Sequence, residues 1–153
     1  MKLEHIELLM KNPYSGSEII THFASGFGEK EIPLHLFYLV LPLVLYKPSR
    51  QVFSNINHNN HLSLILKDNR EIAANFQNRI SEMKELTNLS LIVATNRNWI
   101  QIDTNVTLIN SLDYNKSLEK IKEIHRAAHY FGIILHKEKS YVHVFKHFKV
   151  LPK

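Results

Sequence analysis

Apolar residues recur along most of this chain with the three-to-four-residue period of an α-helix. This spacing predicts amphipathic helices over residues 1–10, 17–27, 70–86, 87–94 and 117–135. A strand over residues 89–95 is an alternative to the helix over 87–94, because that segment is rich in β-branched residues. Shorter apolar runs predict a turn or two of helix over 49–56, a helix or extended segment over 62–66, and a short helix or edge strand over 141–150.

The densest apolar run is LHLFYLVLPLVLYKPSR, at residues 34–50. Its 13 residues from 34 to 46 are too few for a bilayer core, which needs about 20. A helix that is apolar on all sides is buried on all sides, so we interpret this run as the central core element. Proline lacks a backbone N–H and disrupts a helix interior. We therefore expect Pro33 in a first turn, a kink or helix boundary at Pro42, and the end of the run at Pro48.

Turn-forming residues mark the ends of the predicted helices. The segment 12–16 favours a turn, and Ser15 or Ser17 is expected to cap the helix that follows. Gly26 and Gly28 are expected to end that helix, and residues 29–33 to form a linker. Gly132 lies inside the last long helix, where glycine costs about 1 kcal/mol relative to alanine. It indicates either close packing or an early end of the helix.

Two short alternating runs, 99–103 and 106–109, flank the pair Thr104-Asn105 and predict a β-hairpin. With the two helices expected before it, residues 70–109 resemble the order of elements in a winged helix. The predicted fold class is therefore α+β and mainly α, a helical domain with a winged-helix-like element and one β-hairpin near residues 99–109. The length of 153 residues predicts a single domain over residues 1–153. Trp99 is expected in the core, or at a wing tip as an interface anchor.

The C-terminal quarter of the chain carries the whole excess of positive charge behind the formal net charge of +5. Residues 1–115 contain 10 Lys and Arg against 11 Asp and Glu, whereas residues 116–153 contain 9 against 3. This basic segment suits an acidic partner, either a protein surface or a nucleic-acid backbone, and it equally suits an ordinary solvated helix. We assign Lys120, Lys122 and Arg126 to a candidate basic partner surface.

The chain lacks the sequence motifs of common catalytic and cofactor sites. It has no cysteine, which excludes disulfides and thiolate metal sites and is compatible with a reducing cytoplasm. Its four glycines do not form a phosphate-binding loop. The pairs His125 with His129 and His143 with His147 have the i, i+4 spacing of a zinc site, but neither pair encloses a glutamate. We therefore predict no catalytic, cofactor-binding or metal-binding residue, no targeting or membrane-spanning segment, and a cytoplasmic location.

Several motifs make the chain similar to the middle-component proteins of bacterial three-component ABC systems. Asn12-Pro13-Tyr14 precedes an apolar helix that ends at Phe27, and Leu41–Leu45 with Lys47-Pro48-Ser49-Arg50 form the most specific part of the resemblance. The long helix over 117–135 and the closing residues 145–152 extend it to nearly the whole chain. Lys149 departs from the pattern, because members of the family tend to have a glycine there.

The resemblance implies a non-catalytic adaptor subunit without a cofactor. Such a subunit would bridge a Rad50- or SMC-like ABC ATPase and an effector, often a nuclease, in a Lamassu-like anti-phage defence system. Any contact with DNA would be made through the assembled complex. The corresponding interface candidates are Asn12, Pro13, Pro42, Lys47, Pro48, Arg50 and Trp99. Among them, Lys47 and Arg50 are expected to face a partner. The alternative function, suggested by the hairpin and the basic segment, is a stand-alone winged-helix DNA-binding protein.

Overall fold

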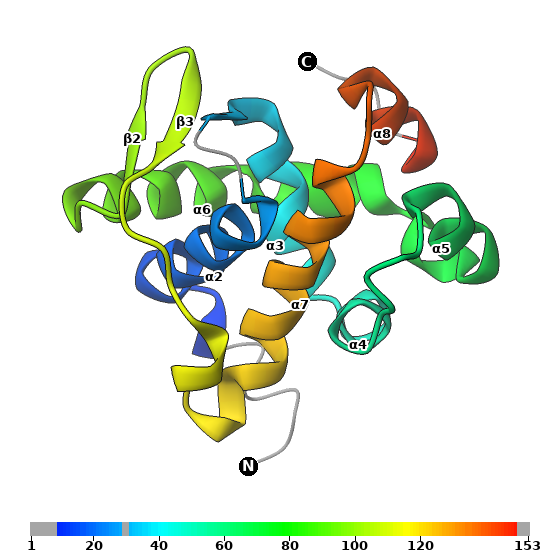
Figure 1. Cartoon of the computed structure of the whole chain (residues 1–153), viewed down its shortest axis with the longest axis horizontal. Helices are drawn as coiled ribbons and strands as arrows, with labels where there is room; N and C mark the ends of the chain where they lie inside the picture. The colour runs from blue at the N-terminus through cyan, green and yellow to red at the C-terminus, as the bar shows by residue number, and fades with distance from the viewer. Residues whose placement is uncertain (1–8, 29–30, 150–153) are drawn as a thin grey trace.

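The computed structural model describes residues 9–28 and 31–149. Their elements, in chain order, are α2 (Pro13–Phe27), β1 (Glu31–Pro33), the 3₁₀-helix η1 (Leu34–Leu39), α3 (Val40–Val44), α4 (Lys47–Ser54), α5 (Leu62–Asp68), η2 (Arg70–Ile72), α6 (Phe76–Asn96), β2 (Ile100–Ile102), β3 (Asn105–Leu108), η3 (Tyr114–Lys116), α7 (Glu119–His136) and α8 (Tyr141–His147). Figure 1 shows α7 crossing the middle of the molecule, with the β2–β3 hairpin on one side and α5 and α8 on the other. The predicted class, α+β and mainly α, is confirmed. The helix expected over 1–10 falls largely outside the described residues.

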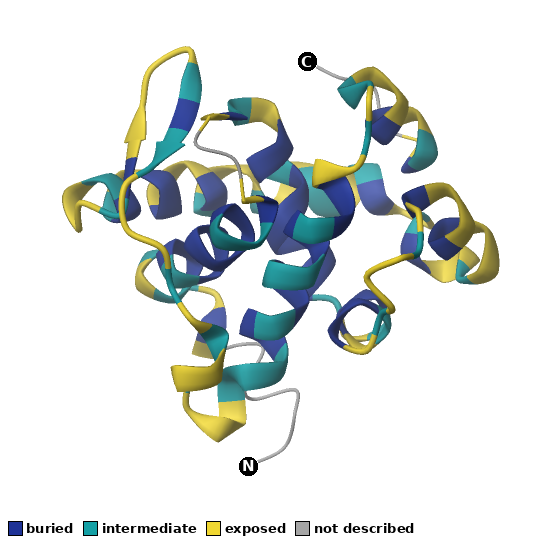
Figure 2. Ribbon diagram, in the orientation of Figure 1, coloured by how far each residue is buried: buried dark blue, intermediate teal, exposed yellow. Residues whose placement is uncertain are grey.

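The apolar run at 34–50 forms the centre of the core, as its composition predicts. Residues 39–45 are all buried, and α3 contacts α2, α6 and α7 (Figure 2). The internal boundaries of the run differ from the prediction. The change from 3₁₀-helix to α-helix at Val40 places Pro42 in the first turn of α3, where its missing N–H costs no helical hydrogen bond. Pro48 does not end the run, because it lies in the first turn of the next helix, α4.

The start of α2 also differs from the prediction. The backbone N–H of Ser15 donates to the side-chain oxygen of Asn12 at 3.0 Å, and Pro13 is the first helical residue. An asparagine cap followed by proline is a favourable helix start. The asparagine side chain accepts a hydrogen bond from a backbone N–H that has no partner within the helix, and proline has no N–H to leave unpaired. Asn12 and Pro13 therefore begin α2, and neither Ser15 nor Ser17 caps it.

The helices α2 and α7 cross through two glycines that bring their backbones into contact. A Cβ atom at Gly26 would lie 1.9 Å from the carbonyl oxygen of His129, and one at Gly132 would lie 2.2 Å from that of Phe23. Only glycine fits at such a crossing. Close packing is thus confirmed for Gly132, whereas the expectation that Gly26 ends α2 is wrong. Gly28, with a φ of 78°, ends this helix.

A single helix, α6, replaces the two helices expected over residues 70–94. Thr87 lies inside α6 and is 1% exposed, so it is a core residue and not a helix cap. The alternative strand over 89–95 is wrong for the same reason. The helix–helix–hairpin order is not observed over residues 70–109, and the winged-helix comparison is not confirmed.

The predicted hairpin is confirmed, and a third strand joins it from a distant part of the chain. Strand β2 pairs with β3 in antiparallel register, with Ile102 opposite Val106. Strand β1, which we expected to be a linker, pairs with the other edge of β3 and places Ile32 opposite Val106. Ile32 and Val106 are both fully buried, so the sheet, in the order β1-β3-β2, is anchored on the core.

The remaining runs are helical. The segments 62–66 and 141–150, for which helix and an extended form were both open, coincide with α5 and α8, and α4 and α7 fall where helices were predicted. Across residues 9–28 and 31–149, no helix is both long enough and apolar enough to cross a membrane.

Candidate functional site

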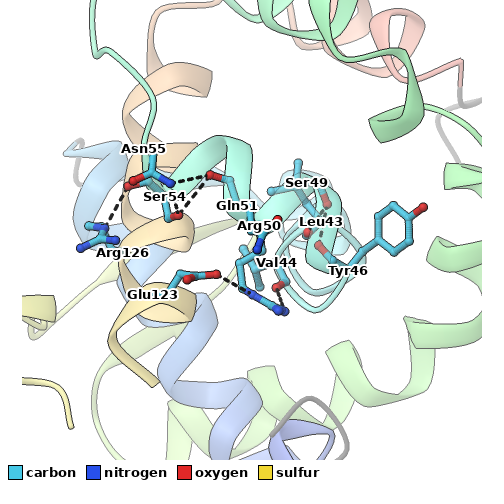
Figure 3. Close-up of polar contacts among 10 residues, drawn as sticks. All are labelled: Leu43, Val44, Tyr46, Ser49, Arg50, Gln51, Ser54, Asn55, Glu123 and Arg126. Carbon is cyan, nitrogen blue, oxygen red and sulfur yellow. Dashed lines mark hydrogen bonds and ion pairs between the residues drawn. The ribbon is translucent and has the colours of Figure 1, made fainter. Parts of the chain in front are cut away.

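The most specific motif of the sequence, Lys47-Pro48-Ser49-Arg50, forms the joint between α3 and α4. The last carbonyl groups of a helix have no partner within it. At the end of α3, the hydroxyl of Ser49 donates to the carbonyl oxygen of Leu43, and Arg50 Nη1 donates to that of Val44 at 3.2 Å (Figure 3). Ser49 and Arg50 thus cap α3 from the first turn of the helix that follows it.

Arg50 also joins this joint to α7. Its Nε lies 3.2 Å from Glu123 Oε1, and its side chain is 1% exposed. The expectation that Arg50 faces a partner is wrong, because both sides of its guanidinium are used for contacts within the fold. Lys47 is exposed and remains an interface candidate, whereas Pro48 is half-buried and Pro42 is buried. The motif therefore serves mainly to hold three helices together.

Trp99 lies at the base of the hairpin and not at its tip. Its backbone carbonyl accepts hydrogen bonds from Ile109 and Asn110, and its half-buried side chain packs against the core. The Arg97 guanidinium stacks 3.7 Å above the indole ring and lies 3.7 Å from Glu18. The alternative position at a wing tip is therefore wrong, and Trp99 packs against the core, as first expected, while also lining a surface pocket.

The three residues assigned to a basic surface do not form one free patch. Lys120 is exposed, but Lys122 and Arg126 are half-buried. Arg126 Nε donates to the carbonyl oxygen of Ser54 at 2.9 Å, which ties α7 to the end of α4 (Figure 3). Lys120 is thus the member of this set that is most open to a partner.

A pocket of about 720 Å³ lies between α2, the turn after α6, and the segment that leads into α7. Its inner wall, here called the histidine wall, consists of His22 and His125, whose rings stack with centroids 4.2 Å apart. His125 Nδ1 lies 2.6 Å from Ser117 Oγ, and its Nε2 lies 3.8 Å from Glu18 Oε2. The sequence pairs His125 with His129, whereas the fold stacks it on a histidine from another helix.

Burial keeps the histidine wall uncharged. Desolvation, with smaller contributions from the nearby His125 and His129 and against an opposing effect of Asp113, lowers the pKa of His22 from 6.5 to about 3. Desolvation also lowers the pKa of His125 to about 4. Both rings are therefore neutral at neutral pH.

The order Ser117, His125, Glu18 invites comparison with a nucleophile, a base and an orienting acid. A pKa near 4 leaves His125 a weak base at neutral pH, and 3.8 Å from its Nε2 to Glu18 exceeds a hydrogen bond. Within the described part of the chain, no group of histidines and carboxylates is placed to hold a metal ion. We assign the Ser117–His125 bond to positioning the start of α7.

Sequence reasoning did not find His22, Glu18 or Ser117 as neighbours of His125. The only available signal was that His22 and Glu18 lie one helical turn apart in α2. That spacing places both on one face of α2, but it does not indicate which distant helix meets that face.

The described residues thus form a mainly helical α+β protein. Most of its motif residues make contacts within the fold. The family model for the ABC-three component (ABC-3C) system Middle Component 3 matches residues 1–152. The chain belongs to this family of middle components, in agreement with the resemblance of its motifs. No curated protein and no solved structure matches the chain.

Proposed function

We propose that this protein is a non-catalytic adaptor that bridges the ATPase and the effector of a three-component ABC system. The observation that carries the proposal is the family match over residues 1–152, because a middle component works together with the other components of its system. The partners we propose are a Rad50- or SMC-like ABC ATPase and an effector subunit such as a nuclease. The proposed setting is anti-phage defence in the bacterial cytoplasm.

The charge of the hairpin favours protein contacts over direct binding to DNA. Residues 98–109, which include both hairpin strands, contain no lysine or arginine and one acid, Asp103. A hairpin that tracks a phosphate backbone needs cations, because phosphate neutralisation supplies most of the affinity for nucleic acid. We therefore place any DNA contact in the assembled complex and not on this subunit alone.

Co-expression with the ATPase and the effector of the same system tests the adaptor role. We expect the three proteins to elute together in size-exclusion chromatography, and we expect the ATPase and effector to separate when this chain is left out. Failure of the chain to elute with either component, with and without ATP, would refute the proposal.

The alternative function is tested with the isolated chain and a DNA duplex at two salt concentrations. We expect no binding in low salt. Tight binding that weakens steeply with added salt would favour the DNA-binding function instead. The defence role is tested by plaque assays, in which removal of this gene from the system should restore phage plating.

A further inference from the structure

Two hollows lie side by side along the first turns of α6 and share Gln77 as a lining residue. The larger one, of about 450 Å³, is lined by η1, α6, α8 and the tip of the hairpin. The smaller one, of about 310 Å³, is lined by the residues around the start of α6 and by Lys149. We call the two together the α6 groove.

The larger hollow is mainly apolar on its walls. Leu34 and Leu39 come from η1, Ile80 from α6 and Phe145 from α8. The His35 ring lies 5.4 Å from that of Phe145, and partial desolvation lowers the pKa of this histidine. This hollow is suited to apolar side chains of a binding partner.

The charged side chains that line the α6 groove are basic. Arg70 and Lys149 line the smaller hollow and Lys84 the larger, and all three are exposed. No aspartate or glutamate among the described residues lines either hollow, and none of the three cations pairs with a described acid. The pocket at the histidine wall differs, because Glu18 and Asp113 line it together with Arg97 and Lys116.

The length of the groove suits about two turns of a partner helix. Gln77, Ile80, Ser81 and Lys84 line the larger hollow at positions i, i+3, i+4 and i+7 of α6. Seven residues of helix span about 10 Å, the distance between apolar residues two turns apart on a facing helix. Such a helix would place its apolar side chains in the larger hollow and acidic side chains opposite Arg70, Lys84 and Lys149.

We propose that the α6 groove binds an acidic amphipathic helix of a partner component. This inference rests on the proposed adaptor function and adds to it the binding surface and the chemistry of the bound segment. Apolar burial supplies the affinity, and the cations set orientation and association rate.

The absence of cysteine from the chain allows a direct test. Ser81→Cys places one thiol at the edge of the larger hollow, and Gln51→Cys places one on the exposed face of α4 as a matched control. Each variant is labelled with a photo-crosslinker, assembled with the purified ATPase and effector, irradiated and digested for mass spectrometry. We expect Ser81→Cys to capture one segment that is acidic and has apolar residues three and four positions apart. Capture of a basic segment, or none from an intact complex, would overturn the proposal.

Charge reversal tests the electrostatic part with balanced controls. The double variant Arg70→Glu with Lys84→Glu should weaken association at least about 10-fold at low salt, because it sets acids against the acids of the partner. Lys11→Glu with Lys139→Glu makes the same change in net charge on exposed residues that lie outside the groove and outside the other interface candidates, and it should bind like the wild type. Equal binding by both double variants would overturn the proposal.

The apolar part is tested by filling the hollow. Ser81→Trp occupies the groove from an exposed helical position and should weaken association about 10-fold or more, whereas Gln51→Trp should not. Circular dichroism and thermal melting verify that each variant is folded. A wild-type chain that forms no complex refutes the adaptor function itself, whereas a complex that tolerates every groove variant refutes only the groove.

Discussion

The two buried histidines of the histidine wall should make this protein lose stability in mild acid. His22 is 3% exposed and His125 is 2% exposed, and burial lowers their pKa values from 6.5 to about 3 and about 4. Above pH 6.5 the unfolded chain also holds these rings neutral, so their contribution to stability is complete there. As the pH falls from 6.5 toward the folded pKa values, the unfolded chain binds two protons that the folded chain does not, and stability is lost.

The size of the loss follows from these pKa values. At pH 5.0 the medium is about 1.5 units below the unfolded pKa and still above both folded values, and one unit corresponds to about 1.4 kcal/mol. Each histidine therefore lowers the free energy of unfolding by about 2 kcal/mol, and the pair by about 4 kcal/mol. This is a large part of the about 5–15 kcal/mol of a typical domain. Burial also lowers the pKa of His129, which acts in the same direction.

Urea unfolding at pH 7.5 and pH 5.0, at constant ionic strength, measures this difference. The fluorescence of Trp99, the only tryptophan, reports the transition together with far-UV circular dichroism. His22→Phe retains a ring against His125 and removes one titrating group, so it should reduce the difference by about half. His143→Phe, at an exposed position, is the control and should leave it unchanged. Equal free energies of unfolding at the two pH values, or a full difference in His22→Phe, would refute the reasoning.

Three further predictions concern the packing that holds the motif residues. Arg50→Met should lower the free energy of unfolding by about 2–4 kcal/mol, because it leaves the Val44 carbonyl and Glu123 without their partner, whereas Lys47→Met should change it by less than about 0.5 kcal/mol. Equal losses of unfolding free energy in Arg50→Met and Lys47→Met, as measured by urea unfolding, would contradict the role of buried Arg50 in joining α3, α4 and α7. Gly132→Ala should destabilise the protein by about 2 kcal/mol or more in thermal unfolding, because the added Cβ would clash with the backbone of α2, and this cost exceeds the better helix propensity of alanine. A stabilised variant would show that α2 and α7 can move apart without cost. Asn12→Ala should cost about 1 kcal/mol and Asn12→Asp much less, as measured by urea unfolding; an equal loss in both would exclude the capping role.

Local pattern was enough to locate most helices and the hairpin. The apolar period of α7, the alternation around Thr104 and the apolar run at 34–50 each predict an element that the structure contains. Helix boundaries were less predictable, because Pro13 and Pro48 read as breakers in the sequence. Each of them lies in the first turn of a helix, where proline is favourable.

The candidate sites were less predictable than the elements. The family motif was visible in the sequence, but the exposure of its charges was not. Arg50 was expected to face a partner because it belongs to the motif at the exit of the apolar run. It instead bonds to Glu123, 73 positions away, and to a carbonyl group at the end of α3. The α6 groove was not predicted, because its walls come from four separate elements.

The sequence by itself determined the family, the mainly helical class, the central apolar core element and the absence of cysteine chemistry, because these depend on composition, on motifs and on the spacing of near neighbours. The tertiary structure alone decided that Arg50 is buried, that His22 stacks on His125, that β1 completes the sheet and that the charged side chains lining the α6 groove are basic. Each of these depends on which distant segments meet. A local pattern does not specify which segments pack together, because many segments of a chain could cover the same apolar face.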